Sequence, residues 1–159
     1  MVLWLQVLIN IIFSYLASVG FALTINVPRR ALNLAGINGV IGWMIYWLTF
    51  HAGLGRAIPN TLGALAIGIC SLAFSRMKKC PVTVFNIPAL VPLVPGVPAY
   101  QAMRAMMGGN TNLAMEYLVK TAIITGAIGV GFLLSTMLTE FYFRIWRFYR
   151  NKKNKYNTH

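Results

Sequence analysis

Negative charge is almost absent from this sequence. Among its 159 residues there is no aspartate, and Glu116 and Glu140 are the two acidic residues. Charged residues of both signs make up 10 % of the chain, whereas soluble domains contain about 25 %. A soluble protein of this length could not cover its surface with so few charges, but a lipid bilayer solvates apolar side chains directly. The shortage of charge therefore argues against a soluble domain and predicts an integral membrane protein.

Motifs for catalysis and for tightly bound cofactors are also missing. The two cysteines, Cys70 and Cys80, do not have the spacing of a metal site, and we interpret them as reduced structural thiols. The chain has no glycine-rich phosphate-binding motif, no cluster of metal ligands and no nucleophile with an evident base. We therefore expect a protein that is not an enzyme and that uses no cofactor and no metal ion.

Long apolar stretches are what the sequence has in abundance. A helix needs about 20 mainly apolar residues to cross the hydrocarbon core. The apolar stretch at the N-terminus lacks the basic start of a signal peptide, so we count it as a span. Five stretches qualify, approximately Val2 to Ile25, Leu34 to Ala52, Ile58 to Phe74, Val82 to Met103 and Leu118 to Leu138. The sequence thus predicts an all-α polytopic membrane helical bundle, with one integral membrane domain over residues 1–143 and a basic cytoplasmic tail over residues 144–159.

The basic residues favour one orientation of these spans. Cytoplasmic loops of membrane proteins carry an excess of lysine and arginine. Eleven of the 14 basic residues follow the first, third and fifth stretches: Arg29, Arg30, Arg76, Lys78, Lys79, Arg144, Arg147, Arg150, Lys152, Lys153 and Lys155. This pattern predicts a multi-pass protein of the plasma membrane with its N-terminus outside and its C-terminus in the cytoplasm. The same short clusters between apolar runs argue against nucleic-acid binding, despite the net charge of +12.

The fourth stretch contains residues that break helices. Proline removes a backbone donor and clashes with the preceding turn, so this stretch cannot form one regular helix. At membrane depth, a broken backbone is tolerated where it is buried in protein or lines a water-filled cavity, and transporters use such breaks to bind substrates. A kinked span with no ligand is the alternative. The candidate substrate-pathway residues in this stretch are Asn86, Pro88, Pro92, Pro95, Gly96 and Pro98.

Two further patterns concern single helices. Glu116 and Lys120 are four residues apart at the start of the fifth stretch, which places them on one helical face, either as an interfacial ion pair or as a substrate or proton site. Small residues also recur at four-residue spacing, which predicts close packing of helix backbones with each other or with a partner. These pairs are Ala35 and Gly39, Ala64 and Gly68, Ala122 and Gly126, and Ala127 and Gly131.

Two segments resemble the threonine/serine exporter (ThrE) family. The first is the end of the first stretch, from Gly20-Phe21-Ala22 through Asn26-Val27-Pro28-Arg29-Arg30-Ala31-Leu32, and the second is the proline-glycine run from Pro88 to Pro98 with Ala99-Tyr100-Gln101-Ala102-Met103 after it. The order of the spans and the length resemble the small YjjB-like subunit of that family. From the first motif, the resemblance nominates Asn26, Pro28 and Arg30.

The resemblance implies a secondary transporter subunit that exports small amino acids, threonine and serine, together with a larger YjjP-like membrane subunit. Two alternatives stay open, namely a dicarboxylate exporter of the succinate type and a scaffold subunit that does not itself transport. The expected partners are therefore that larger subunit, the lipid bilayer and a small amino acid or dicarboxylate, and a homo-oligomer is not excluded by the sequence.

Overall fold

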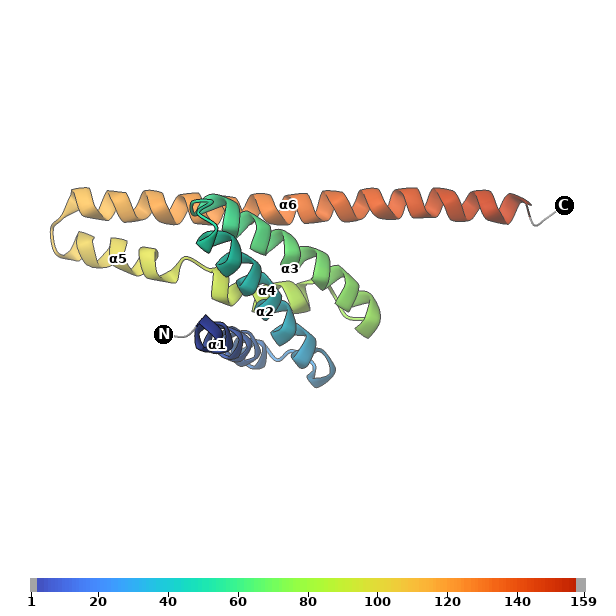
Figure 1. The fold of residues 1–159 in the computed structure, drawn as a ribbon, viewed down its shortest axis with the longest axis horizontal. Helices are drawn as coiled ribbons and strands as arrows, with labels where there is room; N and C mark the ends of the chain where they lie inside the picture. The colour runs from blue at the N-terminus through green and yellow to red at the C-terminus, as the bar shows by residue number, and fades with distance from the viewer. Residues whose placement is uncertain (1–2, 157–159) are drawn as a thin grey trace.

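The computed structural model describes the backbone of residues 3–156 and the side chains of residues 4–141. All regular structure in this part of the chain is helical, which confirms the predicted all-α fold (Figure 1). The elements are α1 (Leu3–Thr24), α2 (Arg29–His51), α3 (Ala57–Lys78), α4 (Thr83–Leu90), the 3-10 helix η1 (Val91–Leu93), α5 (Gly96–Met107) and α6 (Thr111–Tyr156). The last three residues of the predicted tail, 157–159, lie outside the described residues.

Left-handed residues and prolines separate the helices. Asn26 (φ 55°) lies in the turn that follows α1, and Lys79 (φ 53°) caps the C-terminus of α3. The connection from α2 to α3 contains Gly53 and Gly55, whose φ values of 80° and 72° suit glycine because it lacks a Cβ atom. These short connections make sequence neighbours pack against each other.

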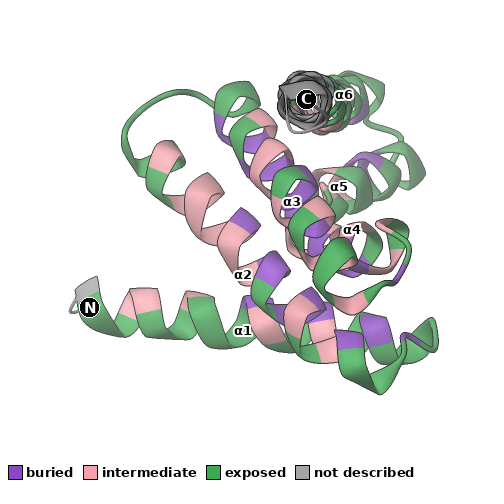
Figure 2. Cartoon of the chain, turned by 90° about the vertical axis from the view of Figure 1, so that its right-hand side faces the viewer, coloured by how far each residue is buried: buried purple, intermediate pink, exposed green. Residues whose placement is uncertain are grey.

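The helix α6 runs along the whole length of the molecule, and the other helices attach to it through α3 and α5 (Figure 1). The helices α2, α3 and α4 pack together, and most of the buried residues lie between them (Figure 2). The helix α1 contacts α2, α4 and η1, and Figures 1 and 2 show it lying crosswise to α6. The helices therefore form a bundle in which α1 is tied to the rest through α2 and the broken segment.

Small residues bring the helix backbones into direct contact, as their spacing predicts. A Cβ atom on Gly131 of α6 would lie 2.5 Å from the carbonyl oxygen of Thr61 in α3. Likewise, a Cβ atom on Gly39 or Gly68 would collide with the hydroxyl of Ser18 or Ser135, respectively. Gly126 is exposed and has no atom within 4 Å of its Cβ position in the described part of the chain, so packing at this position stays a prediction for a partner.

Four helices are long and apolar enough to cross a membrane, and the outer surface of the molecule is largely apolar. They are Trp4–Thr24, Arg29–His51, Ala57–Lys78 and Thr111–Phe141. A fifth span arises if Thr83–Leu93 and Gly96–Met107, which meet at a bend of 56°, count as one broken span. This range of four to five spans supports a multi-pass membrane protein and includes the predicted number.

Two predicted boundaries are wrong. The second span begins at Arg29 rather than near Leu34, because Pro28 occupies the N-cap position and both arginines continue into the helix. The fifth span begins at Thr111 rather than near Leu118, and α6 continues past Leu138. Hydropathy alone misplaces the start of α2 because arginine favours helices and can extend its long side chain toward the interface. It misplaces the start of α6 because residues 113–116, Leu-Ala-Met-Glu, are also good helix formers.

Candidate functional site

The proline-rich segment forms a sharp break between α4 and α5. The helix α4 ends at Leu90, one 3-10 turn follows, and α5 begins at Gly96. Pro95 has φ −75° and ψ 55°, and the N–H of Gly96 donates to the carbonyl of Val94 at 2.8 Å, which closes an inverse γ-turn. Pro98 lies in the first turn of α5, where a missing N–H removes no helical hydrogen bond. The prediction that this stretch is not one regular helix is therefore confirmed.

Helices α2 and α3 hold the first part of this segment in place. The buried Asn38 of α2 donates through Nδ2 to Ser71 Oγ at 2.7 Å and lies 3.4 Å from the carbonyl oxygen of Phe85 in α4. Pro88 is fully buried in α4, and Leu93 of η1 packs closely over Gly63 of α3. The break is consequently supported from one side by protein rather than exposed to lipid.

The other side of the break lines a cavity of about 280 Å³. Its walls come from four parts of the chain that are far apart in sequence. They are an aromatic face on α2 (Trp43, Tyr46 and Phe50), the start of α3 (Arg56 and Asn60), the segment from Pro92 to Pro98, and Ile124 of α6. Broken backbone at this place therefore borders a hollow, which is the arrangement that transporters use at their binding sites.

The aromatic wall is ordered by contacts along α2. The ring centroids of Trp43 and Tyr46 are 5.1 Å apart, and those of Tyr46 and Phe50 are 5.8 Å apart. Trp43 also donates from Nε1 to Asn10 Oδ1 of α1 at 2.7 Å. On the opposite wall, Asn60 donates from Nδ2 to the carbonyl of Arg56 at 2.7 Å and so fixes the first turn of α3.

A second, basic hollow of about 450 Å³ lies near the other end of α2. Arg29, Arg30 and Lys78 supply its positive charges, and Leu34 and Ile37 of α2 form part of its wall. Asn26 and Pro28 lie in the turn just before it, where the carbonyl of Pro28 accepts the N–H of Ala31 at 2.8 Å. The first nominated motif thus lies away from the cavity at the proline break.

Buried polar groups lie on α2 and on the helices that pack against it. Asn38 stands on α2 between Ile37, which lines the basic hollow, and Trp43, which lines the cavity. Three buried oxygen atoms have no hydrogen-bond partner within the described part of the chain: Ser18 Oγ, Asn38 Oδ1 and Asn86 Oδ1. Because unpaired buried polar atoms are costly, these positions are suited to water or to a polar solute. We call Ser18, Asn38, Ser71 and Asn86 the buried polar cluster.

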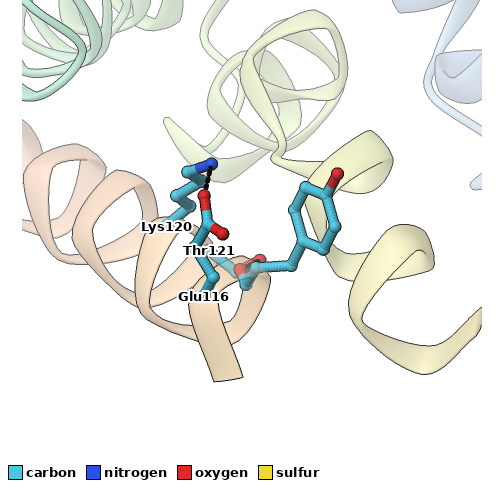
Figure 3. A network of polar contacts seen from close by, with 4 residues as sticks. Glu116, Lys120 and Thr121 are labelled. Atoms are coloured by element: carbon cyan, nitrogen blue, oxygen red, sulfur yellow. Dashed lines mark hydrogen bonds and ion pairs between the residues drawn. The ribbon is translucent and has the colours of Figure 1, made fainter. Parts of the chain in front are cut away.

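Glu116 and Lys120 form an ion pair on α6 and do not line the cavity (Figure 3). Lys120 Nζ lies 2.5 Å from Glu116 Oε1 and 5.2 Å from the centroid of the Tyr117 ring. The side chain of Lys120 is 35 % exposed and that of Glu116 is 58 % exposed. Lys120 precedes the cavity residue Ile124 by one helical turn, so the pair lies beside the cavity rather than in it.

The candidate residues therefore divide into groups by position. Pro92, Pro95, Gly96 and Pro98 meet at the cavity, whereas Pro88 and Asn86 lie in α4 beneath it. Neither Arg56 nor the aromatic face of α2 was predicted from the sequence to be part of the site. The sequence does contain patterns that could have indicated them. Three aromatic residues at three- and four-residue spacing share one face of a helix. Arg56 is one of the few basic residues on the side of the predicted membrane protein that has little charge.

Comparison with known proteins agrees with the family resemblance seen in the sequence. A family model described as "Threonine/Serine exporter, ThrE" matches residues 10–138. A protein of Haemophilus influenzae, whose name is "Uncharacterized protein", is 29 % identical over 156 residues, which cover 93 % of this chain and 50 % of the relative. The chain thus spans about half the length of that relative, and no solved structure matches it. With a family match over most of its helices, the chain belongs to the threonine/serine exporter (ThrE) family.

Proposed function

We propose that the chain is a subunit of a secondary transporter that exports threonine and serine, and that the cavity at the proline break binds the transported molecule. The observation that carries this proposal is the junction of η1 and α5, where Pro92, Pro95, Gly96 and Pro98 border a hollow of about 280 Å³. The volume is close to the lower end of the range of about 300–1,000 Å³ seen for small-molecule sites. It suits a molecule as small as an amino acid.

Two hollows with polar groups between them fit a pathway through the protein. The basic hollow and the cavity lie along the same helix, and Asn38 of the buried polar cluster lies on that helix between them. A transporter must open its binding site to each side in turn, and midplane polar groups mark such routes. The sequence contains no nucleotide-binding motif, so we assign the driving force to an ion gradient.

The proposed orientation follows from the basic residues. With the C-terminus in the cytoplasm of a plasma-membrane protein, the basic hollow at Arg29, Arg30 and Lys78 faces the cytoplasm. The cavity then lies toward the outer surface, beside the connection between α2 and α3. Residues 144–159 would form the basic tail against the anionic inner leaflet.

A larger partner subunit, of the YjjP-like kind, is part of this proposal. The chain spans about half the length of its Haemophilus influenzae relative, so a full-length unit has room for a second half of similar size. Within the described residues, 17 % of the apolar window of α1 and of α6 is buried, so both helices offer apolar faces to such a subunit. A homo-oligomer would use the same faces.

Threonine efflux from preloaded cells tests the proposed function. Cells that express this chain together with the YjjP-like subunit are expected to release threonine faster than cells that express either protein alone. The double variant Pro95→Ala with Gly96→Ala is expected to lower efflux at normal membrane levels of both proteins, because the turn that shapes the cavity is lost. If efflux by this variant equals that of the wild type, the chain acts as a scaffold rather than as part of the pathway.

A further inference from the structure

We infer that Arg56 binds the carboxylate group of the transported molecule, and that the site recognises this carboxylate far more strictly than an amino group. The inference deepens the proposed function and rests on it. It is drawn from the charge balance of the cavity, from the helix end that faces it and from the nature of its walls.

The charge balance of the cavity is one-sided. Arg56 is the charged residue among those that line it, and neither Glu116 nor Glu140, the two acidic residues of the chain, is part of its wall. The Arg56 guanidinium makes no ion pair or hydrogen bond within the described residues, so its donors are available to a ligand. A guanidinium matches a carboxylate with two parallel hydrogen bonds, which makes arginine the preferred residue for this group.

The N-terminus of α5 adds positive potential at the same cavity. Gly96, Val97 and Pro98 form the first turn of this 12-residue helix, and all three line the hollow. The N–H of Gly96 is bonded to Val94, and Pro98 has none, but the N–H of Val97 makes no hydrogen bond within the described chain. A free N–H at a helix start, combined with the helix dipole, attracts negative charge. The helix end and Arg56 therefore favour the same kind of ligand.

The remaining walls offer little to an ammonium group. A carboxylate partner for such a group is lacking, so it would depend on the faces of Trp43 and Tyr46 or on a backbone carbonyl. The cavity is therefore expected to accept both a small amino acid and a small dicarboxylate, provided that a carboxylate is present.

Ligand-induced stabilisation of the purified full-length chain in nanodiscs tests this inference. The probes are L-threonine, succinate and the corresponding amides that lack a carboxylate, L-threoninamide, which keeps its ammonium group, and succinamide. A ligand that binds the folded state raises the unfolding temperature. Both acids are expected to stabilise the wild-type chain, and both amides are expected to have little effect. Arg56→Gln is expected to weaken binding of the acids by roughly tenfold to a hundredfold, since a charge-assisted pair is lost, and Arg56→Lys by less.

Arg104→Gln is the matched control, because Arg104 is an exposed basic residue of α5 outside the cavity. It should bind both acids as the wild type does. Equal binding by Arg56→Gln and the wild type would overturn the inference, as would the absence of stabilisation by either acid. Equal stabilisation by acids and amides would overturn it as well, because the carboxylate would then contribute nothing to binding.

The outcomes separate this inference from the proposed function. Threonine efflux that persists while Arg56→Gln binds both acids normally would remove Arg56 alone from the account. If Arg56→Gln loses acid binding but the wild type shows no threonine efflux, Arg56 belongs to a carboxylate site on a protein that is not a threonine exporter.

Discussion

Replacement of Gly96 by phenylalanine is expected to reduce threonine efflux to background while the protein still folds. Gly96 lines the cavity, and a Cβ atom built on it meets nothing within 4 Å, so a side chain can enter the hollow without displacing a neighbour. A phenyl ring would occupy a large part of the 280 Å³ and exclude the substrate. The measurement is efflux from preloaded cells, with membrane level and unfolding temperature compared with those of the wild type.

Gly20→Phe is the control for this variant. Gly20 is exposed near the end of α1, also has nothing within 4 Å of its Cβ position, and does not line the cavity. It carries the same increase in size at a comparable open position, so efflux should be retained. Normal efflux by Gly96→Phe at normal protein levels would mean that the transported molecule does not use this cavity.

Replacement of Gly131 by alanine is expected to destabilise the fold strongly for so small a change. Its Cβ atom would lie 2.5 Å from the Thr61 carbonyl oxygen, 2.8 Å from Ala64 Cβ and 3.1 Å from the Leu65 nitrogen. Two of these atoms belong to the backbone of α3 and cannot rotate away. The substitution would force α3 and α6 apart, which should lower the free energy of unfolding by about 1–3 kcal/mol, the cost typical of overpacking. The unfolding temperature in detergent should fall accordingly.

Gly126→Ala makes the comparison sharp because the expected sign is opposite. Gly126 lies on the same helix with no atom within 4 Å of its Cβ position. In an exposed helical position, alanine is favoured over glycine by about 1 kcal/mol, so this variant should be neutral or more stable. Similar unfolding temperatures for the two variants would contradict the close contact between α3 and α6.

Much of the fold could be predicted from sequence because bilayer thickness and proline chemistry act locally. The apolar runs predicted α1 and α3 nearly to their ends, and Pro92, Pro95 and Pro98 predicted the break. Span tilt is different, because it depends on packing against neighbouring helices. Nothing local to α1 indicated that it lies crosswise to α6 (Figure 2).

The site could be predicted only in part, for a related reason. The prolines marked one wall because each acts on its own backbone. Arg56 joins that wall only after the α2–α3 connection folds beside the start of α5, about forty residues later in the chain. Conversely, Glu116 and Lys120 were candidates because they are charged residues in an apolar chain. In the structure they form an ion pair with each other beside the cavity. Their individual role in transport stays a prediction.

Protection of an engineered cysteine by substrate is the sharpest test of threonine binding at the proline break. Val97 lines the cavity and is 69 % exposed, so Val97→Cys, in a chain with Cys70 and Cys80 replaced by alanine, should react with a water-soluble maleimide. Met107→Cys, 80 % exposed at the end of α5 and outside the cavity, is the control. Threonine is predicted to slow labelling of Val97→Cys and to leave that of Met107→Cys unchanged. Equal labelling of Val97→Cys with and without threonine, in a protein that still exports it, would contradict a substrate site at the proline break.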